Sequence, residues 1–96
     1  QRMGRVALAV ADGTHDALVQ RRAPYDLVIA NILAGPLVEL APDIAAIAAP
    51  GAQIVLAGLL TTQASAVERA YRRAGCRVAG RIELGDWTVL RLRVRS

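Results

Sequence analysis

Residues 25–37 place a short apolar run directly before helix-starting residues, and this arrangement most constrains the fold. The run from Leu27 to Ala30 is typical of a strand that is covered on both faces of a parallel sheet. Gly35 and Pro36 end the strand, and proline suits the first turn of a helix because its missing N–H needs no partner there. The segment therefore predicts a strand over 26–31 that passes directly into a helix.

The alternation of strand and helix continues along the rest of the chain. Further strands are predicted at 5–10, 53–58, 77–83 and 87–94, and helices over 36–47 and 64–74. A strand–helix–strand–helix order predicts a parallel sheet with right-handed crossovers. The last two strands are joined by the short turn Gly85-Asp86 and should form an antiparallel hairpin. The sequence thus predicts an α/β fold whose parallel sheet ends in a carboxyl-terminal antiparallel hairpin.

Local signals indicate where these elements begin and end. Pro42 lies inside an apolar helical stripe and should kink the helix or restart it at Pro42-Asp43. Pro50-Gly51 is predicted to be a turn, and Thr61 and Thr62 are predicted helix N-caps. Gly75 is placed to stop the second helix in a left-handed conformation.

Three single residues are expected to serve the fold alone. Trp87 opens the last strand and is expected to fill part of the core. Cys76 follows the helix stop and should be a packing residue. Asp26 precedes the buried run and should anchor the entrance of the strand.

Composition favours a soluble cytoplasmic protein. The chain is 54% hydrophobic, which argues against disorder, and no apolar run approaches the roughly 18 residues of a membrane span. The single cysteine cannot form an internal disulfide, as expected in a reducing compartment. No second histidine or cysteine lies close in sequence to His15, so we expect no metal site.

Positive charge is concentrated at the carboxyl-terminal end. Residues 69–96 carry eight arginines and two acidic residues, whereas residues 1–68 have a net charge of −2. A basic segment can meet nucleic acid, but the aromatic side chains that stack on bases number only three in the chain. We favour a solvated arginine-rich face, and expect nucleic-acid contact, if any, only through residues 69–96.

Asn31 stands at the carboxyl end of the predicted central strand. Ligands of open α/β sheets bind just outside the carboxyl ends of strands, so a polar residue there is a candidate site residue. The alternative is an asparagine that merely caps the following turn. The residues themselves leave both interpretations equally open.

A specific motif adds a family resemblance over residues 6–92. Its parts are Tyr25-Asp26-Leu27-Val28-Ile29-Ala30-Asn31-Ile32-Leu33-Ala34-Gly35-Pro36-Leu37, Glu39-Leu40-Ala41-Pro42, Pro50-Gly51, Gly58-Leu59-Leu60, Gln63, Tyr71 and Gly75. The motif resembles the PrmA family, the methyltransferases of large-subunit ribosomal protein eleven. The resemblance implies the second half of a Rossmann-like class I methyltransferase. In that fold the last strand of a doubly wound sheet is antiparallel and inserted beside the fifth.

The resemblance also implies a reaction and a division of roles. The reaction would be methylation of lysine or amino-terminal amines of a ribosomal protein with S-adenosyl-L-methionine. Asn31 and the carbonyl of Ile32 would accept hydrogens of a neutral amine and aim its lone pair. The substrate entrance would be lined by Ile32, Leu33 and Pro36. Gly13, Thr14 and Asn31 would be cofactor contacts.

One departure from the family pattern limits this expectation. No Gly-x-Gly pattern occurs, so the cofactor loop, the ribose-binding acidic residue and the substrate-recognition domain should lie upstream of Gln1. We therefore expect residues 1–96 to be the carboxyl-terminal part of a catalytic domain, inactive alone, whose third strand at 5–10 lacks its usual neighbour. Its exposed edge would invite dimerisation. Two alternatives stay open: a non-catalytic half-domain or interaction module with a basic tail, and a same-fold methyltransferase of small molecules or nucleic acid.

Overall fold

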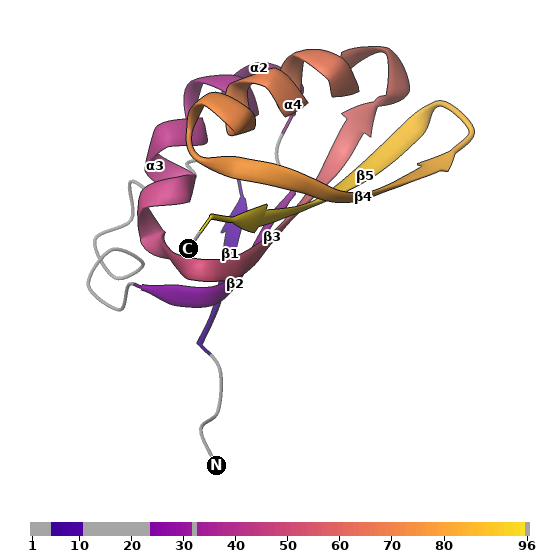
Figure 1. The fold of residues 1–96 in the computed structure, drawn as a ribbon. Coiled ribbons are helices and arrows are strands. Elements are labelled where there is room, and N and C mark those ends of the chain that lie inside the picture. Colours follow the sequence, from indigo (N-terminus) through magenta and orange to yellow (C-terminus); the bar gives the residue numbers. More distant parts are fainter. Residues whose placement is uncertain (1–4, 11–23, 32, 96) are drawn as a thin grey trace.

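The computed structural model describes residues 5–10, 24–31 and 33–95. The described elements, in chain order, are β1 (Val6–Val10), β2 (Tyr25–Asn31), α2 (Ala34–Glu39), α3 (Ala41–Ile47), β3 (Ala48–Leu60), the 3-10 turn η2 (Thr61–Gln63), α4 (Ala64–Arg73), β4 (Cys76–Leu84) and β5 (Trp87–Val94). Figure 1 shows a layered molecule, with α2, α3 and α4 above the sheet and the hairpin of β4 and β5 at one end.

The sheet has the predicted mixture of parallel and antiparallel pairing. Its order is β1-β2-β3-β5-β4. β1, β2 and β3 are parallel, whereas β5 is antiparallel to both β3 and β4. The last strand of the chain is therefore inserted beside β3, as the resemblance implied.

The place of β1 differs from the expected order of a doubly wound sheet. In the order 3-2-1-4-5-6 the third and fourth strands are separated by two others. Here β1, the predicted third strand, pairs directly with β2, from Val6 beside Leu27 to Val10 beside Asn31. The physical reason is that the edge of β2 presents N–H and C=O groups that require partners. Asp26 helps to anchor this entrance as predicted, since its carboxylate accepts the Arg5 backbone N–H at 2.9 Å.

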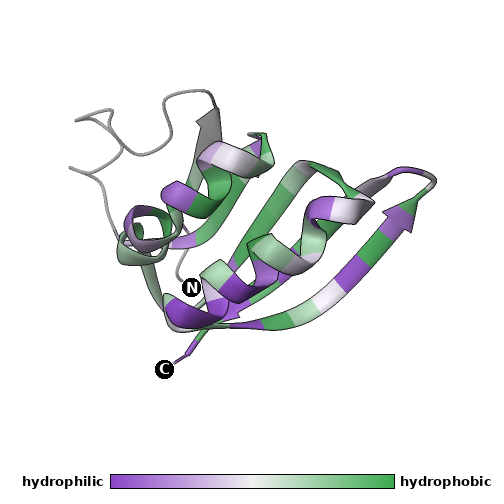
Figure 2. Ribbon diagram, turned by 90° about the horizontal axis from the view of Figure 1, so that it is seen from above, coloured by the Kyte–Doolittle hydropathy of each residue, from purple (hydrophilic) through white to green (hydrophobic). Residues whose placement is uncertain are grey.

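The core lies between the helices and one face of the sheet. Residues buried there include Val28, Ala30, Leu37, Ile44, Ile54, Leu56, Val67, Tyr71, Leu90 and Leu92. Figure 2, which looks down on the helix side, shows hydrophobic residues along the central strands and alternating hydropathy along the hairpin. Leu27 and Ile29 alternate with the buried residues of β2 and are only partly buried. The prediction that this strand is covered on both faces is therefore wrong for the described residues.

Tyr71 ties α4 to α2 within this core. Its side chain is fully buried, and its hydroxyl donates a hydrogen bond to the Leu37 carbonyl at 3.1 Å. Burial, reinforced by the nearby Cys76, raises the pKa of the Tyr71 hydroxyl. Burial likewise raises the pKa of the Cys76 thiol, as expected for an inert packing residue.

The first predicted helix restarts, as the proline indicated. α2 ends at Glu39, and α3 begins at Ala41 with Pro42 in its first turn. Leu40 joins the two helices, and its carbonyl accepts the Ile44 N–H at 2.8 Å. The predicted interruption of the helix is thus confirmed, but it falls at Leu40, two residues before Pro42.

The predicted turn at Pro50-Gly51 is wrong, because β3 runs through it. Pairing with β2 shifts there: Tyr25 lies beside Ala48, but Leu27 lies beside Gln53. The extra residues of β3 are taken up in a bulge, where Gly51 has a φ of 80° and a proline without an N–H is tolerated. Arg93 donates to the Gly51 carbonyl at 2.9 Å.

The expected N-caps at Thr61 and Thr62 are also wrong. Neither side chain caps α4. The Thr61 hydroxyl instead lies 2.9 Å from that of Thr88, and Gln63 Oε1 accepts the Leu60 N–H at 3.1 Å. The contact with Thr88 of β5 therefore engages the Thr61 hydroxyl, which the local sequence pattern had assigned to the start of the helix. The predicted stop at Gly75 is confirmed, with a φ of 96°.

Trp87 does not fill the core, because 54% of its surface is exposed. The alternation of β5 turns Thr88, Leu90 and Leu92 toward the helices and so turns Trp87 to the opposite face.

Candidate functional site

Asn31 lies where the sequence placed it, at the carboxyl end of β2. It pairs with Val10 of β1 on one side and with Ala57 of β3 on the other. Because these three strands are parallel, their carboxyl ends share this edge of the sheet. The Asn31 side chain is exposed, so the amide is open to a ligand approaching the edge.

The chain turns from β2 into α2 within two residues of Asn31. Leu33 has extended backbone angles, φ −61° and ψ 155°, and its carbonyl accepts the Leu37 N–H at 3.0 Å. Leu33 is 71% exposed and Pro36 is exposed, whereas Leu37 is fully buried and holds the helix against the sheet. The two predicted substrate-facing residues that the structure describes therefore lie at the start of α2, two and five residues after Asn31 in the chain.

The asparagine does not act as the cap that the alternative interpretation requires. The start of α2 has no side-chain cap hydrogen bond. Within the described part of the chain, no hydrogen bond engages the Asn31 amide. Its oxygen and its two N–H groups are thus available in that environment to an amine or to another polar ligand.

The remaining predicted site residues lie outside the described residues. They are Ile32, Gly13 and Thr14. The structure does show that β1 ends at Val10, which pairs with Asn31.

The described residues at this edge do not include the groups that typically hold the ribose and phosphates of a nucleotide cofactor. Parallel-sheet nucleotide sites hold the ribose with a carboxylate and pack the chain closely with glycines. Among the described residues, the ends of β1 and β2 offer Asn31 and no carboxylate. The same part of the chain contains no cluster of three or more His, Cys, Asp or Glu residues that could hold a metal ion. Its helices are also too short and too polar to cross a membrane.

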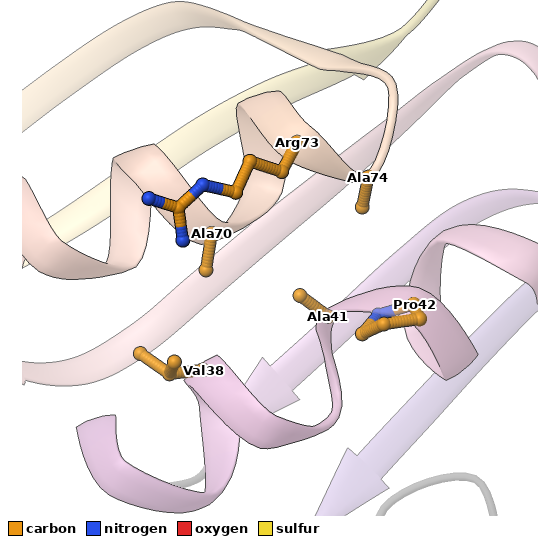
Figure 3. Close-up of a pocket in the computed structure, with 6 residues that line it drawn as sticks. All are labelled: Val38, Ala41, Pro42, Ala70, Arg73 and Ala74. Carbon is orange, nitrogen blue, oxygen red and sulfur yellow. The ribbon is translucent and has the colours of Figure 1, made fainter.

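The groove on the helix side is a separate feature. Its lining residues, drawn in Figure 3, are Val38, Ala41, Pro42, Ala70, Arg73 and Ala74. It runs between α4 and the α2–α3 pair, and it shares no residue with the Asn31 edge. We therefore do not assign it to the candidate site.

The arginines of residues 69–96 are partly occupied by contacts within the molecule. Arg81 contacts Glu68 at 3.2 Å and Glu83 at 2.8 Å, and Arg72 contacts Glu68 at 3.6 Å. These contacts engage two of the eight arginines of this segment, and the preference for a solvated basic face stays a prediction.

Comparison with known protein families identifies the family whose sequence region contains this edge of the sheet. The model of the family described as ribosomal protein L11 methyltransferase (PrmA) matches residues 4–95. The chain belongs to the ribosomal protein L11 methyltransferase family. The match includes the whole segment from β2 through α2, so Asn31 lies within the family region.

Curated relatives agree with the family match. The ribosomal protein L11 methyltransferase of Caulobacter sp. (strain K31) is 48% identical over 80 residues, which cover 83% of this chain and 28% of the relative. The protein of the same name from Rhizobium rhizogenes is 40% identical over 87 residues, covering 91% of this chain and 30% of the relative. The chain thus spans less than a third of the length of these relatives.

Solved structures confirm the fold. The ribosomal protein L11 methylase of Lactobacillus delbrueckii subsp. bulgaricus has a TM-score of 0.77 and 22% identity, over 90% of this chain and 43% of its own. A complex titled M1.HpyAVI-SAM has a TM-score of 0.71 and 15% identity, over 94% of this chain and 55% of its own. The α/β, Rossmann-like methyltransferase fold predicted from the sequence is therefore correct.

The sequence did not reveal the apolar face of the sheet opposite the helices. Leu60, Ile82, Leu84 and Trp87 are exposed on the strands that form it. The signal was present in the alternation of β5, whose residues between the core positions include Trp87 and Val89 as well as arginines.

Proposed function

We propose that the protein carrying this sequence methylates amino groups of ribosomal protein L11, with S-adenosyl-L-methionine as methyl donor, and that Asn31 positions the amine. The proposal rests on one observation: an exposed amide without a hydrogen-bond partner in the described part of the chain, at the carboxyl end of a central strand in a member of this family. The names of the relatives supply the substrate.

Methyl transfer to an amine requires the protein to position the amine and does not require a nucleophilic side chain. The bound cofactor supplies an electrophilic methyl group. The attacking amine must be neutral, close and correctly aimed, and holding it in that geometry provides much of the rate. Asn31 Oδ1 accepts one hydrogen of the amine, and we assign a second acceptor role to the carbonyl of Ile32. The lone pair then points away from both acceptors and toward the methyl group.

Proton loss from the amine precedes this step. A lysine amine has a pKa of about 10.4, so it must give up a proton before it can attack. The described residues beside Asn31 are apolar or amide, and none of them is a base. We therefore propose that the proton leaves to water at this open edge of the sheet.

Cofactor binding is assigned only in part to these residues. We propose that Gly13 and Thr14, in the chain that follows β1, and Asn31 contact the cofactor. The carboxylate for the ribose is assigned to the part of the relatives that this chain does not match. By this proposal the chain carries the amine side of the site.

A chimera tests the proposal. It joins the part of the Caulobacter sp. relative that this chain does not match, which we place upstream, to residues 1–96. We expect it to transfer radioactive methyl groups from S-adenosyl-L-methionine to recombinant ribosomal protein L11, with the label on amine nitrogens by mass spectrometry. A folded, cofactor-binding chimera that labels RNA or small amines but not the ribosomal protein would contradict the assignment.

A further inference from the structure

The helix that follows Asn31 is too short to hold its own position. α2 has six residues, and isolated helices shorter than about 12 residues are marginal in water. Its first turn has no side-chain cap hydrogen bond. The place of α2 against the sheet therefore depends on tertiary contacts, which include the burial of Ala34 and Leu37 and one hydrogen bond from α4.

The break between α2 and α3 leaves backbone carbonyls of α2 without helical partners. The last four carbonyls of a helix have no intrahelical N–H, and Pro42 has no N–H with which to extend the ladder. The Pro36 carbonyl accepts the Leu40 N–H at 2.9 Å. The carbonyl of Leu37, a fully buried residue, accepts the Tyr71 hydroxyl at 3.1 Å. At Leu37 a hydroxyl from α4 therefore serves where a backbone N–H would serve in a longer helix.

Packing on the outer side of the helices does little to fix α2 against α4. Figure 3 shows Val38 and Ala41 on one wall of the groove, facing Ala70 and Ala74 on the other. These small side chains leave a space of about 290 Å³ between the helices. A hydrogen bond has a preferred distance and angle, so the bond from Tyr71 supplies the defined geometry that this loose contact lacks.

The position of α2 bears on Asn31 because the connection between them is short. Ala34, the first residue of α2, follows Asn31 by three residues. On the strand side, Asn31 is held by pairing with Val10 and Ala57. A shift of α2 must therefore be taken up between Asn31 and Ala34, the segment to which we assign the two acceptors for the amine.

We propose that Tyr71 is a positioning residue of the amine site: its hydroxyl fixes α2 through the Leu37 carbonyl and so holds the two acceptors that aim the amine. By this proposal Tyr71 touches neither the amine nor the cofactor. The inference rests on the proposed function, because it concerns the geometry in which the amine is held. Burial raises the pKa of the Tyr71 hydroxyl, so the hydroxyl stays a donor at the alkaline pH at which a lysine amine becomes neutral.

Kinetics of Tyr71→Phe in the chimera test the positioning role, because this variant loses the hydroxyl and keeps the ring. We expect kcat for methyl transfer to ribosomal protein L11 to fall about 10-fold, since small displacements of reacting groups slow the reaction. The KM for each substrate should change less than about 2-fold, as for an effect on the transition state alone. The matched control is Val67→Ala, which removes a fully buried apolar side chain of the same helix. It should lower the melting temperature and leave kcat within about 2-fold, measured well below the unfolding transition.

Hydrogen exchange tests the contact itself without methyl transfer. In residues 1–96 the Leu37 and Leu40 amides donate to the Leu33 and Pro36 carbonyls at 3.0 and 2.9 Å. We expect both amides to exchange about 5-fold faster in Tyr71→Phe, as for the loss of one neutral hydrogen bond that opposes local opening. The amides of β3 should exchange at the unmodified rate. Nuclear magnetic resonance resolves the individual amides.

The two measurements together decide the proposal. A lower kcat with unchanged KM values and faster exchange in α2 support it. An unchanged kcat overturns it, and so does unchanged exchange in α2 or a loss of kcat in Val67→Ala as large as that in Tyr71→Phe. An unmodified chimera that binds the cofactor and transfers no methyl group contradicts the proposed function instead, and exchange alone then decides whether Tyr71 fixes α2.

Discussion

Replacing Asn31 with alanine in the chimera should lower the rate of methyl transfer by about 100-fold, the cost of a misaligned reacting group. The side chain is exposed at the carboxyl end of β2, and no hydrogen bond to it is seen within the described part of the chain. Its loss should leave the fold intact and remove one acceptor that holds the amine. Affinity for S-adenosyl-L-methionine should change less than about 3-fold, below 1 kcal/mol. Steady-state kinetics and calorimetry measure the two quantities separately.

The matched control for this variant is Thr62→Ala. Thr62 is exposed in η2, which follows the carboxyl end of β3, and we assign it no role in the site. Its replacement should leave both turnover and cofactor affinity near those of the unmodified chimera. Equal losses of turnover and affinity in Asn31→Ala would show that Asn31 serves only as one of the cofactor contacts and does not aim the amine.

Two neighbouring residues of β3 should differ widely in their contribution to stability. Leu56 is fully buried under the helices, and Leu56→Ala should cost about 2–5 kcal/mol through lost burial and a new cavity. For a domain of this size each kcal/mol lowers the melting temperature by roughly 4–8 °C. Val55 lies on the face opposite the helices and is only partly buried, so Val55→Ala should cost less than about 1 kcal/mol.

Thermal unfolding of residues 1–96, followed by circular dichroism, compares the two variants directly. Because Val55 and Leu56 are adjacent on one strand, a difference between the two variants reports which face of the sheet each side chain occupies. A Val55→Ala cost as large as that of Leu56→Ala would mean that the face opposite the helices is already covered in the isolated chain.

The sequence predicted the elements whose signals are repeated along the chain. Alternation in 87–94 and the stripe of the second helix each depend on several residues, and both elements appear within a few residues of their predicted bounds. The insertion of β5 between β3 and β4 followed from the family resemblance. These predictions thus rested either on periodicity or on a long motif, whereas the confirmed helix break near Pro42 and the helix stop at Gly75 rested on residues whose effect on the backbone is local.

The wrong predictions depended on single residues whose partners are distant in sequence. Pro50-Gly51 looks like a turn, but β3 pairs with β2 on both sides of it, at Ala48 and at Gln53, and passes through it as a bulge. Thr61 looks like a helix cap, but Thr88 takes its hydroxyl. Trp87 looks like a core residue, but the alternation of β5 puts it on the face opposite to the buried Thr88 and Leu90.

The candidate site was also predicted only in part from the sequence. The position of Asn31 at the end of an apolar strand was predicted and is confirmed, and Leu33 and Pro36 lie at the start of α2, the next element of the chain. Gly13, Thr14 and Ile32 lie outside the described residues, so their roles stay predictions. The exposed apolar face opposite the helices was not predicted, since a strand that is apolar on both sides indicates two covering layers without saying which layer the chain itself provides.

The central claim is that residues 1–96 carry the amine side of the site and lack most of the cofactor side. Calorimetry with S-adenosyl-L-methionine tests it most directly, with residues 1–96 and the chimera measured under the same conditions. The claim predicts micromolar binding by the chimera and no measurable heat from residues 1–96. Micromolar binding by residues 1–96 alone would contradict it.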